Sequence, residues 1–233
     1  MSFKTKKYQV IRGALSKELA NFIFNYMLLQ RDAVAFMIKH NQVNPANPFI
    51  GTHDDKQVPG CYAKYADWVM ETLLMYMIPI MKAKTGLDLV PTYSYTRIYE
   101  KGNILWRHKD RPSWEVSTTL HLGGDEWPIF IDGTGTKSII PRKNPYGPTG
   151  EEVDIKPGAP KGTKVILKVG DMLIYSGCDL EHWREPFQGK VCSQVFLHYN
   201  YANGPYATSN LFDKRPILGI PSHPLKELIS SKI

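Results

Sequence analysis

The chain has 233 residues, of which 42% are hydrophobic and 22% are charged. This composition is typical of a soluble globular protein, and the length suits one domain with a full core. No apolar run reaches the roughly 20 residues needed to cross a membrane, and the basic start of the chain lacks the apolar stretch of a signal peptide. We therefore expect a soluble protein in the cytoplasm or another intracellular compartment, without a membrane partner.

The cysteine count and the charge balance narrow the choice further. Three cysteines, an odd number without metal-ligand spacing, indicate free thiols in a reducing compartment. The chain has 29 Lys and Arg against 22 Asp and Glu, a net charge of +7, which permits an acidic partner such as nucleic acid. The basic residues form no dense run, so a nucleic-acid substrate is not favoured.

The first ninety residues are predicted to be mainly helical support for a β-rich body. Tyr8–Ile11 is typical of a short strand. A helix is expected after Ser16, which suits the N-cap position. Its apolar residues repeat at helical spacing and are expected to face a sheet; they are Leu19, Phe22, Ile23, Tyr26 and Met27.

A second helix is predicted from Ala63 towards Ala83. It would end at two lysines and Gly86, a pattern typical of a helix C-terminus. Pro79 is expected to kink this helix or to start a new turn. One domain over residues 1–233 would then consist of this support (1–90), a β-helix core (91–203) and a C-terminal tail (204–233).

Residues His108 and Asp110 are the most informative pair in the chain. Side chains two apart on an extended segment point the same way, so an imidazole and a carboxylate can reach one metal. His182 follows later, between two further segments with strand character. Two histidines and one carboxylate with open coordination positions are the facial triad of non-haem Fe(II) oxygenases. Strands are predicted around these residues over Tyr93–Tyr99, Val116–Leu122, Thr163–Val169, Met172–Tyr175 and Val191–Tyr199.

The stretch 133–162 interrupts the predicted core between the two halves of the metal site. It contains six glycines and five prolines, so it cannot be a regular strand throughout. Such an insertion is either a lid or substrate-gripping loop or a decorated hairpin without a role, and the sequence leaves both interpretations open.

Four phrases of the chain match a known family in order. They are "RIYEKGNILWRHKD", "VSTTLHL", "VILKVGDMLIYSG" and "EHWREPFQGKVCSQVFLHY". With these phrases the chain resembles the 2-oxoglutarate- and Fe(II)-dependent oxygenases of the prolyl 4-hydroxylase-like group. The resemblance implies a mainly β protein with packed helices, a double-stranded β-helix of the cupin-like or jelly-roll kind.

The resemblance also implies cofactors and their ligands. Fe(II) would be held by the two histidines and the aspartate, with 2-oxoglutarate as cosubstrate, O2 as the oxidant and ascorbate as a further cofactor. In the family a cation at the start of the strand after the second histidine binds the distal carboxylate, which favours Lys190 here. Arg184 is the competing anchor. Tyr99 and His121 match positions that hydrogen-bond the cosubstrate in relatives, although His121 stands where a tyrosine is frequent; as core residues, both are also explained by packing alone.

The function implied is hydroxylation of an unactivated C–H bond, in a prolyl or other residue of a peptide. Two alternatives stay open. One is an oxygenase of the same superfamily that acts on nucleic acid or a small molecule. The other is a non-catalytic cupin-like module that binds a metal or a sugar.

Overall fold

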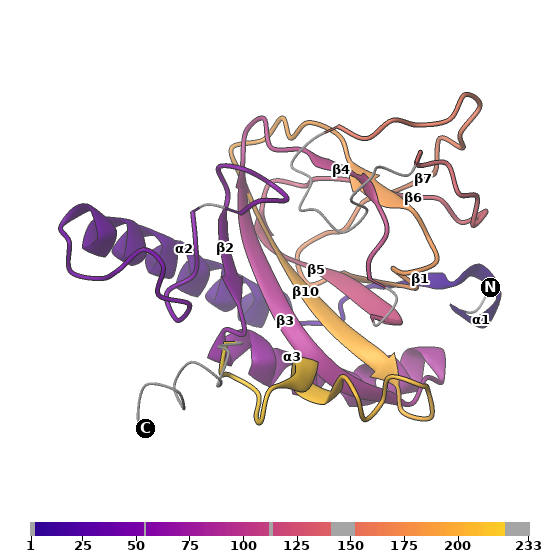
Figure 1. Cartoon of the computed structure of the whole chain (residues 1–233), viewed down its shortest axis with the longest axis horizontal. Coiled ribbons are helices and arrows are strands. Elements are labelled where there is room, and N and C mark those ends of the chain that lie inside the picture. The colour runs from indigo at the N-terminus through magenta and orange to yellow at the C-terminus, as the bar shows by residue number, and fades with distance from the viewer. Residues whose placement is uncertain (1–2, 54, 112–113, 141–151, 222–233) are drawn as a thin grey trace, which may run out of the picture.

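Two antiparallel sheets form the body of the protein (Figure 1). The computed structural model describes residues 3–53, 55–111, 114–140 and 152–221. The larger sheet has the strand order β1 (Tyr8–Ile11), β8 (Met172–Tyr175), β5 (Val116–Gly124), β10 (Val191–Tyr201), β3 (Leu89–Glu100) and β2 (Tyr62–Tyr65). The smaller sheet has the order β4 (Leu105–His108), β9 (His182–Arg184), β6 (Ile129–Ile131) and β7 (Thr163–Val165). This is the predicted jelly roll. The strands predicted around the candidate metal ligands are present, although β7 stops at Val165, whereas β2 covers residues that were assigned to the second helix.

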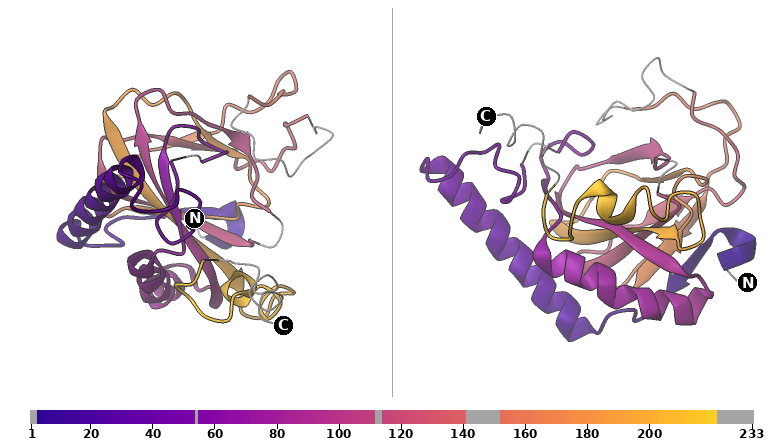
Figure 2. Two further views of the ribbon diagram at one scale, coloured as in Figure 1. Left: turned by 60° about the vertical axis from the view of Figure 1, so that its left-hand side comes forward. Right: turned by 60° about the horizontal axis from the view of Figure 1, so that its bottom comes forward.

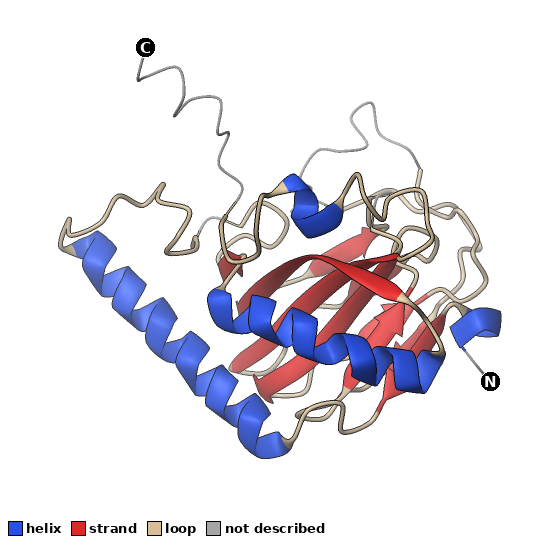
Figure 3. Cartoon of the chain, turned by 90° about the horizontal axis from the view of Figure 1, so that it is seen from below, coloured by secondary structure: helices blue, strands red, loops and turns tan. Residues whose placement is uncertain are grey.

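The two long helices, α2 (Lys17–Lys39) and α3 (Trp68–Thr85), lie on the outer face of the larger sheet, as Figure 3 shows. The short α1 (Phe3–Lys6) lies near the N-terminus, and the 3-10 helix η1 (Leu211–Lys214) follows late in the chain. Apolar residues of α2 and α3 join alternate residues of the strands in the main core. Two smaller clusters fill the space between the sheets. No helix in the described part of the chain is both long and apolar enough to pass through a membrane.

Strand alternation assigns the two faces of the large sheet. On β5, Val116, Leu120 and Leu122 pack against the helices. The odd-numbered residues between them point to the other face, between the two sheets. The polar residues of that inner face are buried, and from β5 they are Ser117, Thr119 and His121.

Helix α2 begins after Ser16 as predicted, but its apolar face is only partly buried. The side chain of Ser16 caps the helix by accepting a hydrogen bond from the Leu19 backbone N–H. Ile23 is buried against the sheet, whereas Leu19 and Phe22 are 40% and 70% exposed. The expectation that all five apolar residues face the sheet is therefore wrong, because the helix carries two apolar stripes and the sheet covers one.

Helix α3 starts later than predicted. Residues from Tyr62 to Tyr65 form β2, which pairs with β3 at the edge of the larger sheet. The helix begins only after Asp67, whose carboxylate caps it by accepting from the backbone N–H groups of Val69 and Met70. It then continues through Pro79 and ends at Gly86, which adopts the left-handed conformation (φ 73°, ψ 15°) expected of that C-terminus.

The segment after β10 packs against the body instead of forming a tail. Arg215 is buried and donates through Nη2 to Oε1 of Glu71 at 3.0 Å. The other carboxylate oxygen of Glu71 accepts from the backbone N–H of Gly219 at 2.6 Å. This buried ion pair links residues 204–221 to α3; the rest of the predicted tail, 222–233, lies outside the described residues.

The Gly/Pro-rich stretch 133–162 is described only in part, because residues 141–151 lie outside the described chain. Its described arms hold one isolated bridge, between Ile139 and Ile155, in an otherwise irregular course. The arms run beside the smaller sheet, on the side of the molecule away from α2 and α3 (Figure 2). The prediction that this stretch is no regular strand holds for the residues described.

Candidate metal centre and anion pocket

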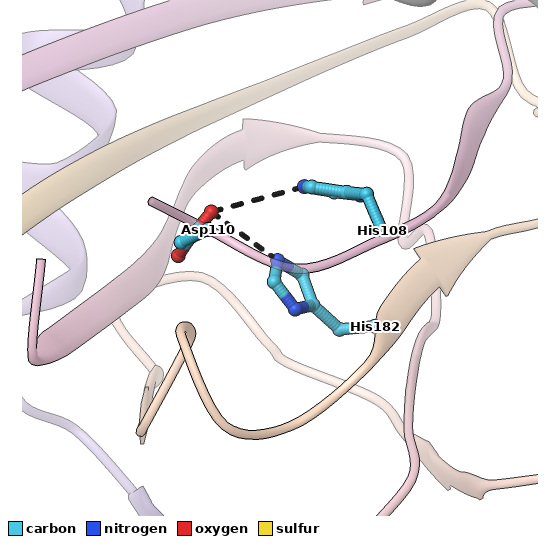
Figure 4. Close-up of side chains that lie close together, drawn as sticks. All are labelled: His108, Asp110 and His182. Carbon is cyan, nitrogen blue, oxygen red and sulfur yellow. Dashed lines mark ion pairs between the residues drawn. The ribbon is translucent and has the colours of Figure 1, made fainter. Parts of the chain in front are cut away.

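His108, Asp110 and His182 converge on one point between the sheets (Figure 4). One nitrogen of each histidine and one oxygen of the aspartate all lie within 4.8 Å of one another. Nε2 of His108 is 3.8 Å from Oδ1 of Asp110, and Nε2 of His182 is 3.7 Å from the same oxygen. The side chains of His108 and Asp110 keep 19% and 10% exposure, so the point is reachable from solvent on their side.

Backbone carbonyls fix the orientation of both imidazole rings. Nδ1 of His108 is 2.8 Å from the carbonyl oxygen of Trp106, and Nδ1 of His182 is 3.0 Å from that of Leu180. A carbonyl can only accept, so each Nδ1 carries the proton and each Nε2 keeps its lone pair. This is how proteins orient histidines that bind metals.

The carboxylate of Asp110 is held by its own set of contacts. Its backbone N–H donates to the carbonyl of Gly177 at 2.9 Å. Its Oδ2 accepts a short hydrogen bond from the hydroxyl of Ser117. That hydroxyl lies 3.1 Å from Nδ1 of His198, and because its proton is engaged by Asp110, His198 is the donor. Oδ1 is thereby left for the point shared with the histidines.

Burial and the neighbouring charges shift the pKa values of His108 and Asp110 towards the forms that bind a cation. Burial, with the neighbouring His182, lowers the pKa of His108 to about 3. Burial alone would raise the pKa of Asp110, but the three nearby histidines and the Ser117 hydroxyl hold it below its ordinary value. At neutral pH His108 is therefore a neutral imidazole and Asp110 a carboxylate, which are the protonation states that bind a divalent metal.

Gly177 leaves no room for a side chain beside this carboxylate. A Cβ built on it would lie 1.9 Å from Oδ2 of Asp110 and 2.6 Å from Oγ of Ser117. We expect Gly177→Ala to displace the carboxylate and to weaken divalent-metal binding about ten- to a hundredfold, the range found when groups that orient ligands are lost. Calorimetric titration with Mn(II) or Fe(II) measures this. Cys178→Ala in the same turn is the control, and equal affinity of both variants would contradict the expectation.

Arg184 lies two residues after His182 on β9, and strand alternation points both side chains inward. The guanidinium is 1% exposed. Its Nη1 donates to the carbonyl of Trp127 and its Nη2 to the hydroxyl of Thr119. Its Nε has no partner, and no carboxylate of the described residues pairs with it. A buried cation without an anion is costly, so this guanidinium is suited to an anionic ligand.

Two further donors without partners border this guanidinium. The hydroxyl of Tyr99 and Nε2 of His121 are buried and have no hydrogen-bond partner. The amide of Gln194 donates to Nδ1 of His121 at 2.9 Å, because the hydroxyl of Thr119 donates to the amide oxygen and so fixes its orientation. His121 therefore carries its proton on the unpartnered Nε2.

The protonation states of these neighbours follow from burial and from the arginine. Burial, with the nearby Arg184 cation, lowers the pKa of His121 to about 4. Burial raises the pKa of Tyr99 to about 12, against the opposing effect of Arg97 and Arg184. The imidazole is therefore neutral and the phenol protonated at neutral pH. Three unpartnered N–H and O–H groups are therefore buried near one another, on Arg184, Tyr99 and His121. We call these three residues the anion pocket, because such a set of donors fits a carboxylate.

Lys190 does not reach this pocket. Strand β10 begins at Val191, and Lys190 lies exposed in the turn before it. Its backbone N–H donates to Oδ2 of Asp125 at 2.6 Å, which fixes the turn. Lys190 was expected at the start of this strand, but the strand begins one residue later; Cys192 and Gln194, further along it, are buried.

The arms of the Gly/Pro-rich stretch are tied to residues next to the metal-site histidines. Arg107 donates through Nε to Oε2 of Glu181 at 2.8 Å, through Nη2 to Asp132 at 3.0 Å and through Nη1 to the carbonyl of Pro160 at 2.8 Å. The other oxygen of Glu181 accepts from the backbone N–H of Ser138 at 2.7 Å. Both arms of the stretch are therefore tied to the two segments that carry His108 and His182, through residues that alternate with the histidines.

Several residues that shape the site were not predicted from the sequence. Ser117 and Thr119 lie on β5 in phase with His121, so the alternation of that strand is the signal that points to them. Gly177 and His198 carry no such signal, because their roles depend on contacts between segments far apart in the chain.

Comparison with known proteins identifies the fold. No protein-family model and no curated protein sequence matches the chain. Among solved structures, the chain has the fold of 2-oxoglutarate- and Fe(II)-dependent oxygenases. The predicted resemblance to the prolyl 4-hydroxylase-like group is confirmed at the level of the fold.

Three of these structures illustrate the likeness. A prolyl-4-hydroxylase from Pseudomonas putida is 14% identical, with a TM-score of 0.52 over 85% of this chain and 95% of that one. HygX from Streptomyces hygroscopicus, with nickel, 2-oxoglutarate and hygromycin B bound, is 14% identical, with a TM-score of 0.55 over 86% of this chain and 85% of that one. The epimerase SnoN, with Fe3+, α-ketoglutarate and a nogalamycin ligand, is 12% identical, with a TM-score of 0.56 over 95% of this chain and 90% of that one.

Proposed function

We propose that this protein is an Fe(II)- and 2-oxoglutarate-dependent dioxygenase. The observation that carries the proposal is the pairing of two sites on β9. His182 points into a group of two histidines and one carboxylate, and Arg184, two residues on, points into a buried pocket without an acidic partner. A metal that keeps open positions next to an anion pocket suits a chelating 2-oxo dicarboxylate.

Different residues would bind the metal and the cosubstrate. His108, Asp110 and His182 would hold Fe(II), and Arg184 would bind the distal carboxylate of 2-oxoglutarate with the help of Tyr99 and His121. When bound, iron and 2-oxoglutarate supply the activation of O2 for attack on an unactivated C–H bond. The protein orients both groups and lets solvent and substrate approach from the side of His108. Ascorbate as a further cofactor has no residue assigned to it.

We propose that the reaction is a hydroxylation, and a panel of substrates would identify the class of molecule that is hydroxylated. HygX and SnoN, which have a related fold, bind hygromycin B and a nogalamycin ligand, and a third protein with this fold is a prolyl-4-hydroxylase. Peptides with prolyl or other acceptor residues and small molecules therefore both belong in a substrate panel. Oligonucleotides form a third class, which the dispersed basic residues do not favour.

An anaerobic titration separates this proposal from a non-catalytic cupin-like module. We expect Fe(II) and then 2-oxoglutarate to produce a weak visible absorption band, and O2 to yield succinate from 2-oxoglutarate. Zn(II) in place of Fe(II) is the control and should give neither signal, because it has no redox chemistry. Metal binding without the band and without succinate would favour the non-catalytic module.

A further inference from the structure

Helix α2 carries a second apolar stripe, turned away from the sheet. Its positions follow one another at alternating intervals of three and four residues, the heptad spacing of a coiled-coil seam. We call this stripe the α2 seam; its members are Leu19, Phe22, Tyr26, Leu29, Ala33 and Phe36. The residues that pack against the sheet lie on another side of the helix and are Ala20, Ile23, Met27 and Val34.

The seam is exposed except at Tyr26, which is half-buried and donates through its hydroxyl to Oδ2 of Asp67 at 2.8 Å. Phe22, Leu29 and Phe36 are 70%, 71% and 57% exposed, and Leu19 is 40% exposed. The helix extends past the edge of the sheet (Figures 1 and 3), so no strand covers this side. Contiguous apolar surface of this kind marks an interaction site in soluble proteins. Because the helix is already ordered by its packing on the sheet, binding a partner carries no entropy cost for folding the helix.

We propose that the α2 seam binds the α2 seam of a second copy of this chain, as an antiparallel pair of helices related by a two-fold axis. In a two-fold interface each contact between two positions occurs twice. The antiparallel register that aligns the whole seam places Phe22 against the partner subunit's Ala33. It also places Leu19 against the partner subunit's Phe36, and Tyr26 against the partner subunit's Leu29. Phe22 thus meets the smallest side chain of the seam, Phe36 lies at its end, and Tyr26 meets Leu29 at its centre.

The charges beside the seam agree with this register. The exposed flank holds Glu18, Asn25, Asp32 and Lys39, one residue before each first position of the heptads. The same antiparallel alignment brings Glu18 against the partner subunit's Lys39, and Asn25 against the partner subunit's Asp32. Each dimer therefore gains two pairs of opposite charge and two polar pairs from one flank.

A parallel pair of helices fits less well. It would place Glu18 beside the partner subunit's Ile23, and Asp32 beside the partner subunit's Met37. It would also place Ala33 against its own copy, which leaves a gap in the seam. A membrane surface fits poorly too, because helices that lie on membranes carry mainly basic polar faces, whereas this flank has both signs of charge.

Sedimentation velocity of the full chain, from low micromolar to submillimolar concentration, tests the proposal. We expect a reversible monomer–dimer equilibrium. Leu29→Lys should weaken the dimer at least about tenfold, since it buries a charge in the centre of the seam. Ala35→Lys, an exposed position of α2 outside the seam, is the matched control and should leave it unchanged. Circular dichroism and thermal melting check that each variant is folded.

A charge exchange tests the antiparallel register itself. Glu18→Lys or Lys39→Glu alone should weaken the dimer about fivefold, because each places like charges face to face twice. The double variant Glu18→Lys with Lys39→Glu restores opposite charges and should recover the affinity of the original chain. A monomer at every concentration, or a dimer that Leu29→Lys leaves intact, overturns the interface. A double variant as weak as the single ones overturns the antiparallel arrangement.

Discussion

Asp110→Ala is expected to abolish Fe(II)-dependent consumption of 2-oxoglutarate, with a loss of more than about a hundredfold, while the protein stays folded. The carboxylate is the one anionic member of the group, and both histidine Nε2 atoms lie within 4 Å of its Oδ1. Loss of groups that merely orient metal ligands already costs ten- to a hundredfold in affinity or activity, so loss of a ligand should cost more. His108→Ala and His182→Ala should behave alike. Succinate formation, together with metal content after desalting, measures the effect.

Asp179→Ala is the matched control for this prediction. Asp179 lies close by in the chain before β9, but its carboxylate is 46% exposed and pairs with Lys7 at 2.7 Å. It should leave metal content and turnover almost unchanged. Near-normal decarboxylation of 2-oxoglutarate by the Asp110→Ala protein would remove the basis for the metal site.

Arg184→Ala is expected to raise the 2-oxoglutarate concentration needed for half-maximal turnover about ten- to a hundredfold without removing iron. A charge-assisted hydrogen bond contributes about 1.5–3 kcal/mol, and the buried guanidinium has its Nε free for one. Arg184→Lys should fall between the original chain and the alanine variant, because an ammonium keeps the charge but loses the planar fork of donors. Initial rates over a 2-oxoglutarate series measure all three proteins.

Lys190→Ala separates the two candidate anchors. Lys190 is exposed in the turn before β10, so its loss should change neither the 2-oxoglutarate requirement nor the iron content. Thermal melting shows whether Arg184→Ala has lost its fold, in which case Arg184→Lys carries the comparison. A steep effect of Lys190→Ala with a small effect of Arg184→Lys would return the anchor to Lys190.

The metal group could be predicted from the sequence because its geometry is local. His108 and Asp110 are two apart at the end of one strand, and His182 begins another, so alternation alone brings the three side chains inward. The anion pocket was harder to predict from the sequence. The choice between Lys190 and Arg184 depended on the residue at which β10 starts, and strand ends are the least predictable feature of a sequence.

The same limit explains the differences in the fold. The apolar run after Trp68 is clearly helical. Ala63 to Tyr65 were also assigned to the helix, because their pairing with β3 depends on residues much later in the chain. The N-cap Asp67 was the local signal for the true start. For α2, the apolar spacing predicted the helix, but it did not show that the sheet covers one of two stripes.

Successive residues of strand β5 point alternately to the two faces of the larger sheet. Its even-numbered side chains anchor the helices, while Ser117, Thr119 and His121 each hold a different part of the site. Inserting or deleting one residue within this strand would exchange the two sets, placing leucines at the metal and polar groups in the core. Evolution can therefore change such a strand only by substitution. Under the proposed function, new substrate preferences would instead arise in the loops that connect the strands, whose lengths can vary.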